Sequence, residues 1–128
     1  MKISDSNIDH IFEFSGSLGM LSKCGLKIKR WQNKTVVIAT ELYQDNPGTS
    51  ITSVTASLAK QICEAFSINL QSLIYLECAP KMNSKLSFYD ETYFKVDFDI
   101  INNQFENPKW IKLTQEEIKS FFSEMQQP

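Results

Sequence analysis

The chain lacks most of the residues from which catalytic and metal sites are built. It has a single histidine, His10, and three cysteines, Cys24, Cys63 and Cys78. No pair of cysteines has zinc-site spacing, and no HExxH motif is present. Three thiols leave at least one unpaired, so we expect small, reduced, buried cysteines rather than disulfides. The sequence identifies no reaction, and we expect no catalytic set, no metal and no cofactor.

Long apolar runs and an excess of basic residues are also missing. No stretch approaches the roughly 20 apolar residues of a membrane span, and the polar N-terminus does not resemble a secretory signal. The formal net charge of −2 argues against a general nucleic-acid binder, because phosphate neutralisation requires surplus Lys and Arg. We therefore expect a cytoplasmic protein that does not act at a membrane.

The composition that is present suits one globular domain. Hydrophobic residues make up 42% and charged residues 22% of 128 residues, which is enough for a core without metals or disulfides. We predict a single domain over 1–128, with 1–10 as a loosely ordered arm.

Alternating and β-branched segments predict the strands. Strands 24–31 and 35–42, joined by a polar turn, predict a hairpin. Segment 73–78 is apolar at nearly every position, which is typical of a central strand covered on both faces. We expect a second hairpin around Asp90-Glu91, and a loop over 102–108. The remaining predicted strands are 11–14, 86–89 and 93–100.

Two helices follow from capping and periodicity. After an Asn46-Pro47-Gly48 turn, apolar residues at steps of three and four predict a helix over 50–66, capped by Thr49 or Ser50. Thr114 and Glu117 form the pattern of a capping box and predict a C-terminal helix. The fold class is therefore α+β: a two-layer domain with a mostly antiparallel sheet of four to five strands and both helices on one face.

The entrance of helix 50–66 is the candidate ligand site. Its hydroxyl side chains lie where free amides and the helix dipole favour an anion, although Glu41 and Asp45 would oppose one. Ordinary helix capping is the alternative. Glu41 and Glu77, at the ends of the strands on either side of the helix, could instead converge as a carboxylate pair for acid/base work or a hard cation. The candidate ligand-binding residues are Glu41, Asn46, Gly48, Thr49, Ser50, Thr52 and Glu77.

A basic strand is the candidate partner site. Lys27, Lys29 and Trp31 share one face, and such a ribbon could contact an acidic protein or single-stranded nucleic acid. The alternative is a solvated strand face on which lysine discourages aggregation. Aromatic residues outside the periodic segments, such as Phe105 and Trp110, could anchor a protein interface or plug the ends of the sheet.

Residues 31–80 resemble a group of small uncharacterised bacterial proteins. The shared pattern is E-L…D-N-P-G-x-S-[IV]-T at a helix entrance, seen here as ELYQDNPGTSIT, followed by a strand ending in Glu and Pro, seen here as LIYLECAP. A weaker similarity covers Pro108-Lys109-Trp110 and the last helix, and Cys78 departs from the pattern. The resemblance implies no activity. It implies that the following residues matter beyond folding: Glu41, Asn46, Pro47, Gly48, Ser50, Thr52 and Glu77.

These patterns favour a small bacterial protein that acts without catalysis by binding another protein. An immunity, antitoxin or accessory protein fits its size and acidity, and homo-oligomerisation stays open. The alternative is a small-ligand or anion binder, or an enzyme, that uses the helix entrance at 46–53 with Glu41 and Glu77.

Overall fold

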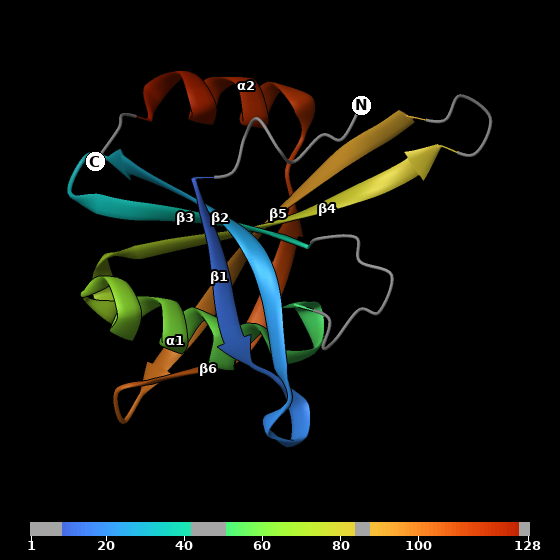
Figure 1. Ribbon diagram of the computed structural model, residues 1–128. Helices are drawn as coiled ribbons and strands as arrows, with labels where there is room; N and C mark the ends of the chain where they lie inside the picture. The colour runs from blue at the N-terminus through green and yellow to red at the C-terminus, as the bar shows by residue number, and fades with distance from the viewer. Residues whose placement is uncertain (1–8, 42–50, 84–87, 126–128) are drawn as a thin grey trace.

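Six strands form one mixed sheet whose order in space follows the order in the chain (Figure 1). The structure is a computed structural model and describes residues 9–41, 51–83 and 88–125. The strands are β1 (His10–Ser15), β2 (Leu21–Trp31), β3 (Lys34–Glu41), β4 (Leu73–Asn83), β5 (Phe88–Ile101) and β6 (Gln104–Lys112). The short 3-10 turns are η1 (Ser17–Gly19), η2 (Ile51–Val54) and η3 (Leu70–Ser72), and the α-helices are α1 (Thr55–Phe66) and α2 (Gln115–Glu124).

Only β3 and β4 pair in parallel, and this pair explains the position of α1. All other neighbouring strands are antiparallel. Parallel neighbours need a crossover connection, and the described part of that connection contains η2, α1 and η3. The predicted 24–31/35–42 hairpin, the crossover between 35–42 and 73–78 and the α+β class are confirmed.

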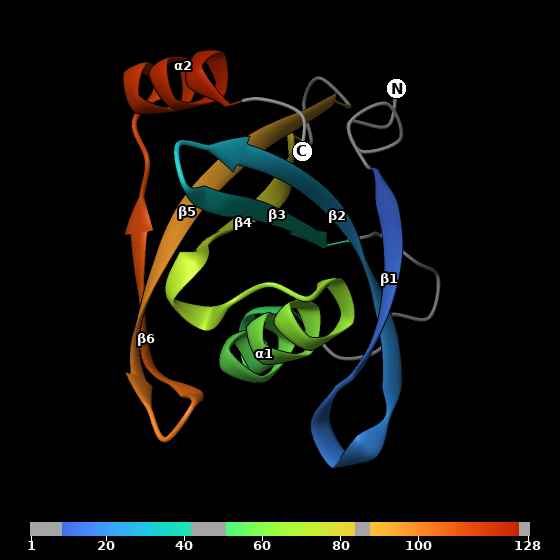
Figure 2. The ribbon, with the colours of Figure 1, turned by 90° about the vertical axis from the view of Figure 1, so that its left-hand side faces the viewer.

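The two helices lie on opposite faces of the sheet, so the prediction of both helices on one face is wrong. Figure 2 shows the sheet arching around α1, with α2 on the other side. Leu58 and Ile62 of α1 share a core with Val37, whereas Phe121 of α2 packs with Val36. Consecutive strand residues point to opposite faces, so a strand that is apolar at consecutive positions needs cover on both.

The sheet has six strands instead of the predicted four to five, and two segments differ from their predicted structure. The predicted hairpin around Asp90-Glu91 does not exist, since both residues lie inside β5, which pairs back onto the extended β4. The predicted loop 102–108 contains the start of β6. Asn102 and Asn103, with φ of 52° and 60°, form the two-residue turn into β6, and asparagine tolerates this left-handed backbone better than most residues. Alternation is weak in β6 because most of this edge strand is exposed.

The two helix starts differ from each other in how they are capped. The Thr114 capping box is confirmed: the Glu117 amide donates to Thr114 Oγ1 at 3.1 Å, and the Thr114 amide donates to Glu117 Oε1 at 2.9 Å. The predicted 50–66 helix instead divides into η2 and α1, and Val54 at the α1 N-cap position provides no side-chain cap. The predicted turn at 46–48 and the predicted caps Thr49 and Ser50 lie outside the described residues.

The predicted apolar face of α1 is confirmed. Ile51, Leu58 and Ile62 are buried, and Val54 and Phe66 pack at the edge of the same core. All three cysteines are buried and unbridged. Neither helix of the described chain combines the length and apolar character needed to cross a membrane.

Candidate functional site

Glu77 is a buried acidic side chain on the central strand β4. Its exposed fraction is 1%. In the register of the parallel pair it lies opposite Ala39 of β3, and in the antiparallel pair opposite Phe94 of β5. The small methyl group of Ala39 leaves room for a longer side chain beside it. Glu77 thus points to the α1 side of the sheet, where burial of a carboxyl group is costly unless hydrogen bonds compensate.

Three side chains donate hydrogen bonds to the Glu77 carboxylate. Thr55 Oγ1 and Tyr75 Oη donate to Oε2 at 2.7 and 3.0 Å, and Trp110 Nε1 donates to Oε1 at 2.8 Å. These donors come from α1, β4 and β6, so the carboxylate joins three elements of the fold. The indole nitrogen of Trp110 is a donor only, which fixes the direction of its bond.

No positive charge balances this carboxylate within the described part of the chain. All three donors are uncharged groups, and the single ion pair among the described residues joins Lys95 and Asp97 at 3.7 Å on the surface. Burial, together with the neighbouring Glu77, raises the pKa of Tyr75 well above its usual value of 10.0. Tyr75 therefore keeps its proton and acts as a donor at neutral pH.

Glu41 lies at the end of β3 and caps the start of η2. Its Oε1 accepts a hydrogen bond from the Ile51 amide at 3.2 Å. The protein's own carboxylate thus occupies one of the amides at which an external anion was expected. A second anion there would also meet the charge of Glu77, so the geometry argues against the anion hypothesis.

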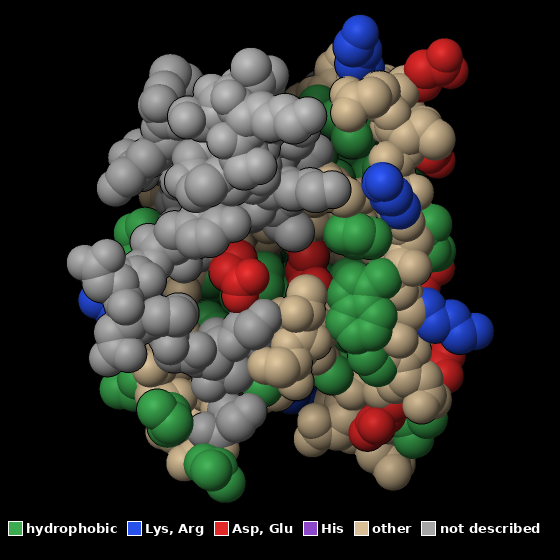
Figure 3. Space-filling view, turned by 90° about the vertical axis from the view of Figure 1, so that its right-hand side faces the viewer, with side chains coloured by type: hydrophobic (Ala, Val, Ile, Leu, Met, Phe, Trp, Pro, Cys, Tyr) green, Lys and Arg blue, Asp and Glu red, His purple; other side chains and the backbone are tan. Residues whose placement is uncertain are grey.

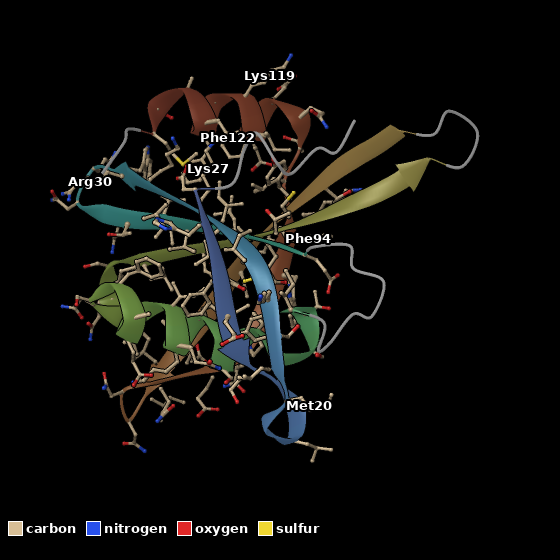
Figure 4. All side chains as sticks on the ribbon, in the orientation of Figure 1. Met20, Lys27, Arg30, Phe94, Lys119 and Phe122 are labelled. Carbon is tan, nitrogen blue, oxygen red and sulfur yellow. The ribbon has the colours of Figure 1, made fainter. Side chains whose placement is uncertain are left out.

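A cleft of about 320 Å³ connects the two carboxyl groups (Figure 3). Figure 3 shows acidic side chains (red) in a hollow at the centre of this face, bordered by hydrophobic side chains (green). Phe94 lies on this side of the molecule (Figure 4). The described residues that line the cleft are Glu41, Ile51, Thr52, Glu77, Cys78, Phe94 and Trp110, and we call this site the Glu77 cleft.

The cleft brings together part of the predicted ligand set. Glu41, Thr52 and Glu77 all line it. Four other predicted residues lie outside the described residues, namely Asn46, Gly48, Thr49 and Ser50. Phe94 was predicted only as a strand residue, and Trp110 only as an aromatic that anchors an interface or plugs the sheet. A strand prediction for β6 would have placed Trp110 on the face of Val96, its partner in the register.

The pKa of Cys24 is affected by both carboxylates of the cleft. It is fully buried on β2, directly opposite Glu41 in the register. Burial, and then the charges of Glu77 and Glu41, raise its pKa from 9.0 to about 12. Burial also raises the pKa of Cys63 to about 11. Neither thiol is a nucleophile at neutral pH, because the thiolate is the reactive form.

The predicted partner site does not present a free aromatic ring. Lys27, Lys29 and Trp31 do share one face, the face covered by α2. Trp31 packs edge-on against Phe121, with ring centroids 5.5 Å apart, and belongs to the core beneath the helix. Figure 4 shows Lys27 next to this region and Phe122 on α2. Trp31 therefore serves packing, which argues against base stacking.

The hairpin of β1 and β2 exposes large apolar side chains that the sequence does not predict. The exposed fractions are 99% for Leu18, 59% for Met20, 65% for Leu21 and 61% for Ile11. Met20 lies at the end of the hairpin, away from the body of the protein (Figure 4). The exposure of Leu18 could not be predicted from a single apolar residue.

No family model matches the chain. No curated protein and no solved structure matches it either. Within the described ranges, no group of three His, Cys, Asp or Glu side chains gathers where it could hold a metal ion.

Proposed function

We propose that this chain binds a small organic molecule in the Glu77 cleft. The observation that supports the proposal is the convergence of Glu41, Glu77 and Trp110, from three different strands, on one cavity. Ligand sites are typically hollows with apolar walls and a few precisely oriented polar groups. The Glu77 cleft has this character, since Ile51 and Phe94 also line it.

The cost of burying Glu77 supports a role beyond packing. An uncompensated buried charge costs several kcal/mol, and an apolar residue of similar size would avoid that cost. The protein instead surrounds this carboxylate with Thr55, Tyr75 and Trp110. These bonds hold the carboxylate in one orientation, as a recognition group requires.

Binding is tested with a fragment library by thermal shift and calorimetry, on the wild type and two cleft variants. Glu41→Gln and Trp110→Phe should each weaken the binding of hits by about tenfold, because each removes a group at the cavity wall. Glu106→Gln is the matched control, since it removes one exposed carboxylate from β6 outside the cleft. The proposal fails if no fragment binds, or if all three variants bind every hit as the wild type does.

A protein partner is the second candidate function, because a specific surface supports it. Leu18, Met20 and Leu21 form an exposed apolar hairpin end. Patches of this kind often mark protein interfaces. Under this proposal the chain is an accessory or immunity-like protein of a bacterial cytoplasm, as the sequence predicts.

A photo-crosslinking residue at position 18 tests the partner hypothesis in cells, with Ile101 as the control position. Ile101 is 49% exposed and lies on β5. The captured protein is then purified and its affinity measured for Leu18→Ser and Ile101→Ser. Loss of affinity in the first variant only is expected. Crosslinks at both positions, or equal affinities, would argue against this surface.

A further inference from the structure

We infer that the ligand of the Glu77 cleft is an organic cation: an ammonium, amidinium or guanidinium group on a small apolar body. This inference rests on the proposed function and adds the chemical class of the ligand. Four observations support the inference. They are the negative charge of the cleft, its aromatic wall, the lone pairs of its carboxylates that are left for a ligand, and the poorer fit of other ligand classes.

The first feature is the negative charge of the cleft. Glu41 and Glu77 both line it, and no Lys or Arg of the described chain forms an ion pair with either one. Within the described ranges, the hydrogen bonds to Glu77 come from two hydroxyl groups and an indole, and the bond to Glu41 comes from a backbone amide. Like charges in one partly desolvated cavity repel each other. A bound monocation would attract both carboxylates and offset this repulsion.

The aromatic wall is the second feature. Trp110 donates its indole N–H to Glu77 at 2.8 Å, so the ring and the carboxylate are held together. Phe94 lies opposite Glu77 in the register of β4 and β5 and also lines the cleft. Aromatic rings attract cations through their quadrupole, and tryptophan does so most strongly.

The third feature is hydrogen-bonding capacity. A carboxylate can accept about four hydrogen bonds. From the described residues, Glu77 accepts three hydrogen bonds and Glu41 accepts one, from Ile51. The remaining lone pairs suit a ligand rich in donors, and an ammonium group has three N–H bonds while a guanidinium has five.

Other ligand classes fit the cleft less well. An anion would meet two carboxylates. A hard metal ion such as Ca²⁺ takes about six to eight oxygen ligands, whereas no cluster of three candidate ligands exists in the described chain. A neutral ligand would leave the charge of the cleft unbalanced.

The test uses three test compounds of similar shape and different charge: benzamidine, benzamide and benzoate. Phenethylamine and phenethyl alcohol form a second pair that separates ammonium from hydroxyl. Binding to the wild-type protein is measured by calorimetry and by NMR shifts of the Trp110 indole N–H. We expect at least one cation to bind, with its neutral and anionic counterparts weaker by about tenfold or more.

Variants separate the role of charge from that of shape. Glu41→Gln should weaken cation binding by about tenfold and leave benzamide unchanged, and Glu106→Gln should change neither. Equal or tighter binding of benzamide or benzoate at the Trp110 indole would overturn the inference and leave the proposed function intact. If no compound of this set and no library fragment binds, both the inference and the proposed function fail.

Discussion

The two faces of the sheet are covered in different ways. On the concave side, α1 is enclosed by the arch of the sheet, and its Leu58 and Ile62 have no exposed surface. On the other side, α2 follows β6 at the end of the chain and has no fully buried residue. The strand side chains beneath both helices are equally buried, as Val36 and Val37 show. The helices therefore differ in how deeply their own side chains are buried, and the more deeply buried helix is the one around which the sheet curves.

The difference bears on the proposed function, because the Glu77 cleft lies on the α1 side. Strong hydrogen bonds and a rigid wall need surroundings that exclude water. The tightly packed side provides them, and Thr55 at the start of α1 is itself a donor to Glu77. The α2 side contributes packing through Phe121, Phe122 and Met125.

The largest expected effect comes from the core beneath α1. Leu58→Ala should lower the free energy of unfolding by about 3 kcal/mol, because it removes a fully buried side chain and leaves a cavity. Urea denaturation measures this change. A loss below about 1 kcal/mol would mean that the site collapses around the smaller residue and that α1 is not rigidly enclosed.

Glu77→Gln should have the next largest effect. The substitution keeps the volume but brings an amide N–H₂ toward three donors, so at least one donor loses its acceptor. A cost of about 2 kcal/mol is expected from one unsatisfied buried group, again by urea denaturation. The exposed Glu106→Gln variant is the control and should change stability by less than about 0.5 kcal/mol. Equal stability of both variants would contradict the proposed hydrogen-bond network.

Phe121→Ala tests the weaker cover on the α2 side. Its side chain is half-buried and packs edge-on against Trp31. We expect a loss of about 1.5 kcal/mol, roughly half the loss for Leu58→Ala, because less apolar area leaves water contact. Trp31 fluorescence should also shift to longer wavelength. If Phe121→Ala costs as much as Leu58→Ala, the two faces do not differ in packing energy.

Loss of the α2 cap should be smaller still. Thr114→Ala removes the acceptor for the Glu117 amide and should cost about 1 kcal/mol. Circular dichroism should show partial loss of helix, with Thr114→Ser close to the wild type. An unchanged spectrum and stability for Thr114→Ala would show that packing alone holds α2.

A pH dependence of stability should appear in alkali. The pKa of Cys24 is raised from 9.0 to about 12, so the unfolded chain loses this proton at lower pH than the folded chain. Stability should therefore be independent of this thiol below pH 9 and fall as pH rises toward 12, by up to about 1.4 kcal/mol per unit. In Cys24→Ala the alkaline slope should be smaller. An unchanged slope would mean that groups other than Cys24 cause the loss of stability in alkali.

Local patterns in the sequence were sufficient for several elements. The β2–β3 hairpin, the central strand β4, the apolar face of α1 and the Thr114 capping box all follow from residues close together in the chain. The failures involve edges and pairings. The exposed strand β6 has little alternation, and the Asp90-Glu91 dipeptide that predicted a turn lies within a strand, because its pairing with the extended β4 outweighs local turn propensity.

The candidate site shows the same division. Glu41 and Glu77 could be predicted to converge, because they lie near the ends of strands on either side of one crossover. The contribution of Trp110 could not, since it depends on β6 pairing with β5 and on the curvature of the sheet. The sequence also did not reveal that Trp31 packs under α2.

Residue order alone therefore determined the α+β class, the crossover helix and the two carboxylates at its flanks, because these depend on periodicity and on short-range capping. Only the tertiary structure decided which face each helix covers and which donors reach Glu77. Those features depend on the register and curvature of a six-stranded sheet, and both arise from contacts between residues far apart in the chain.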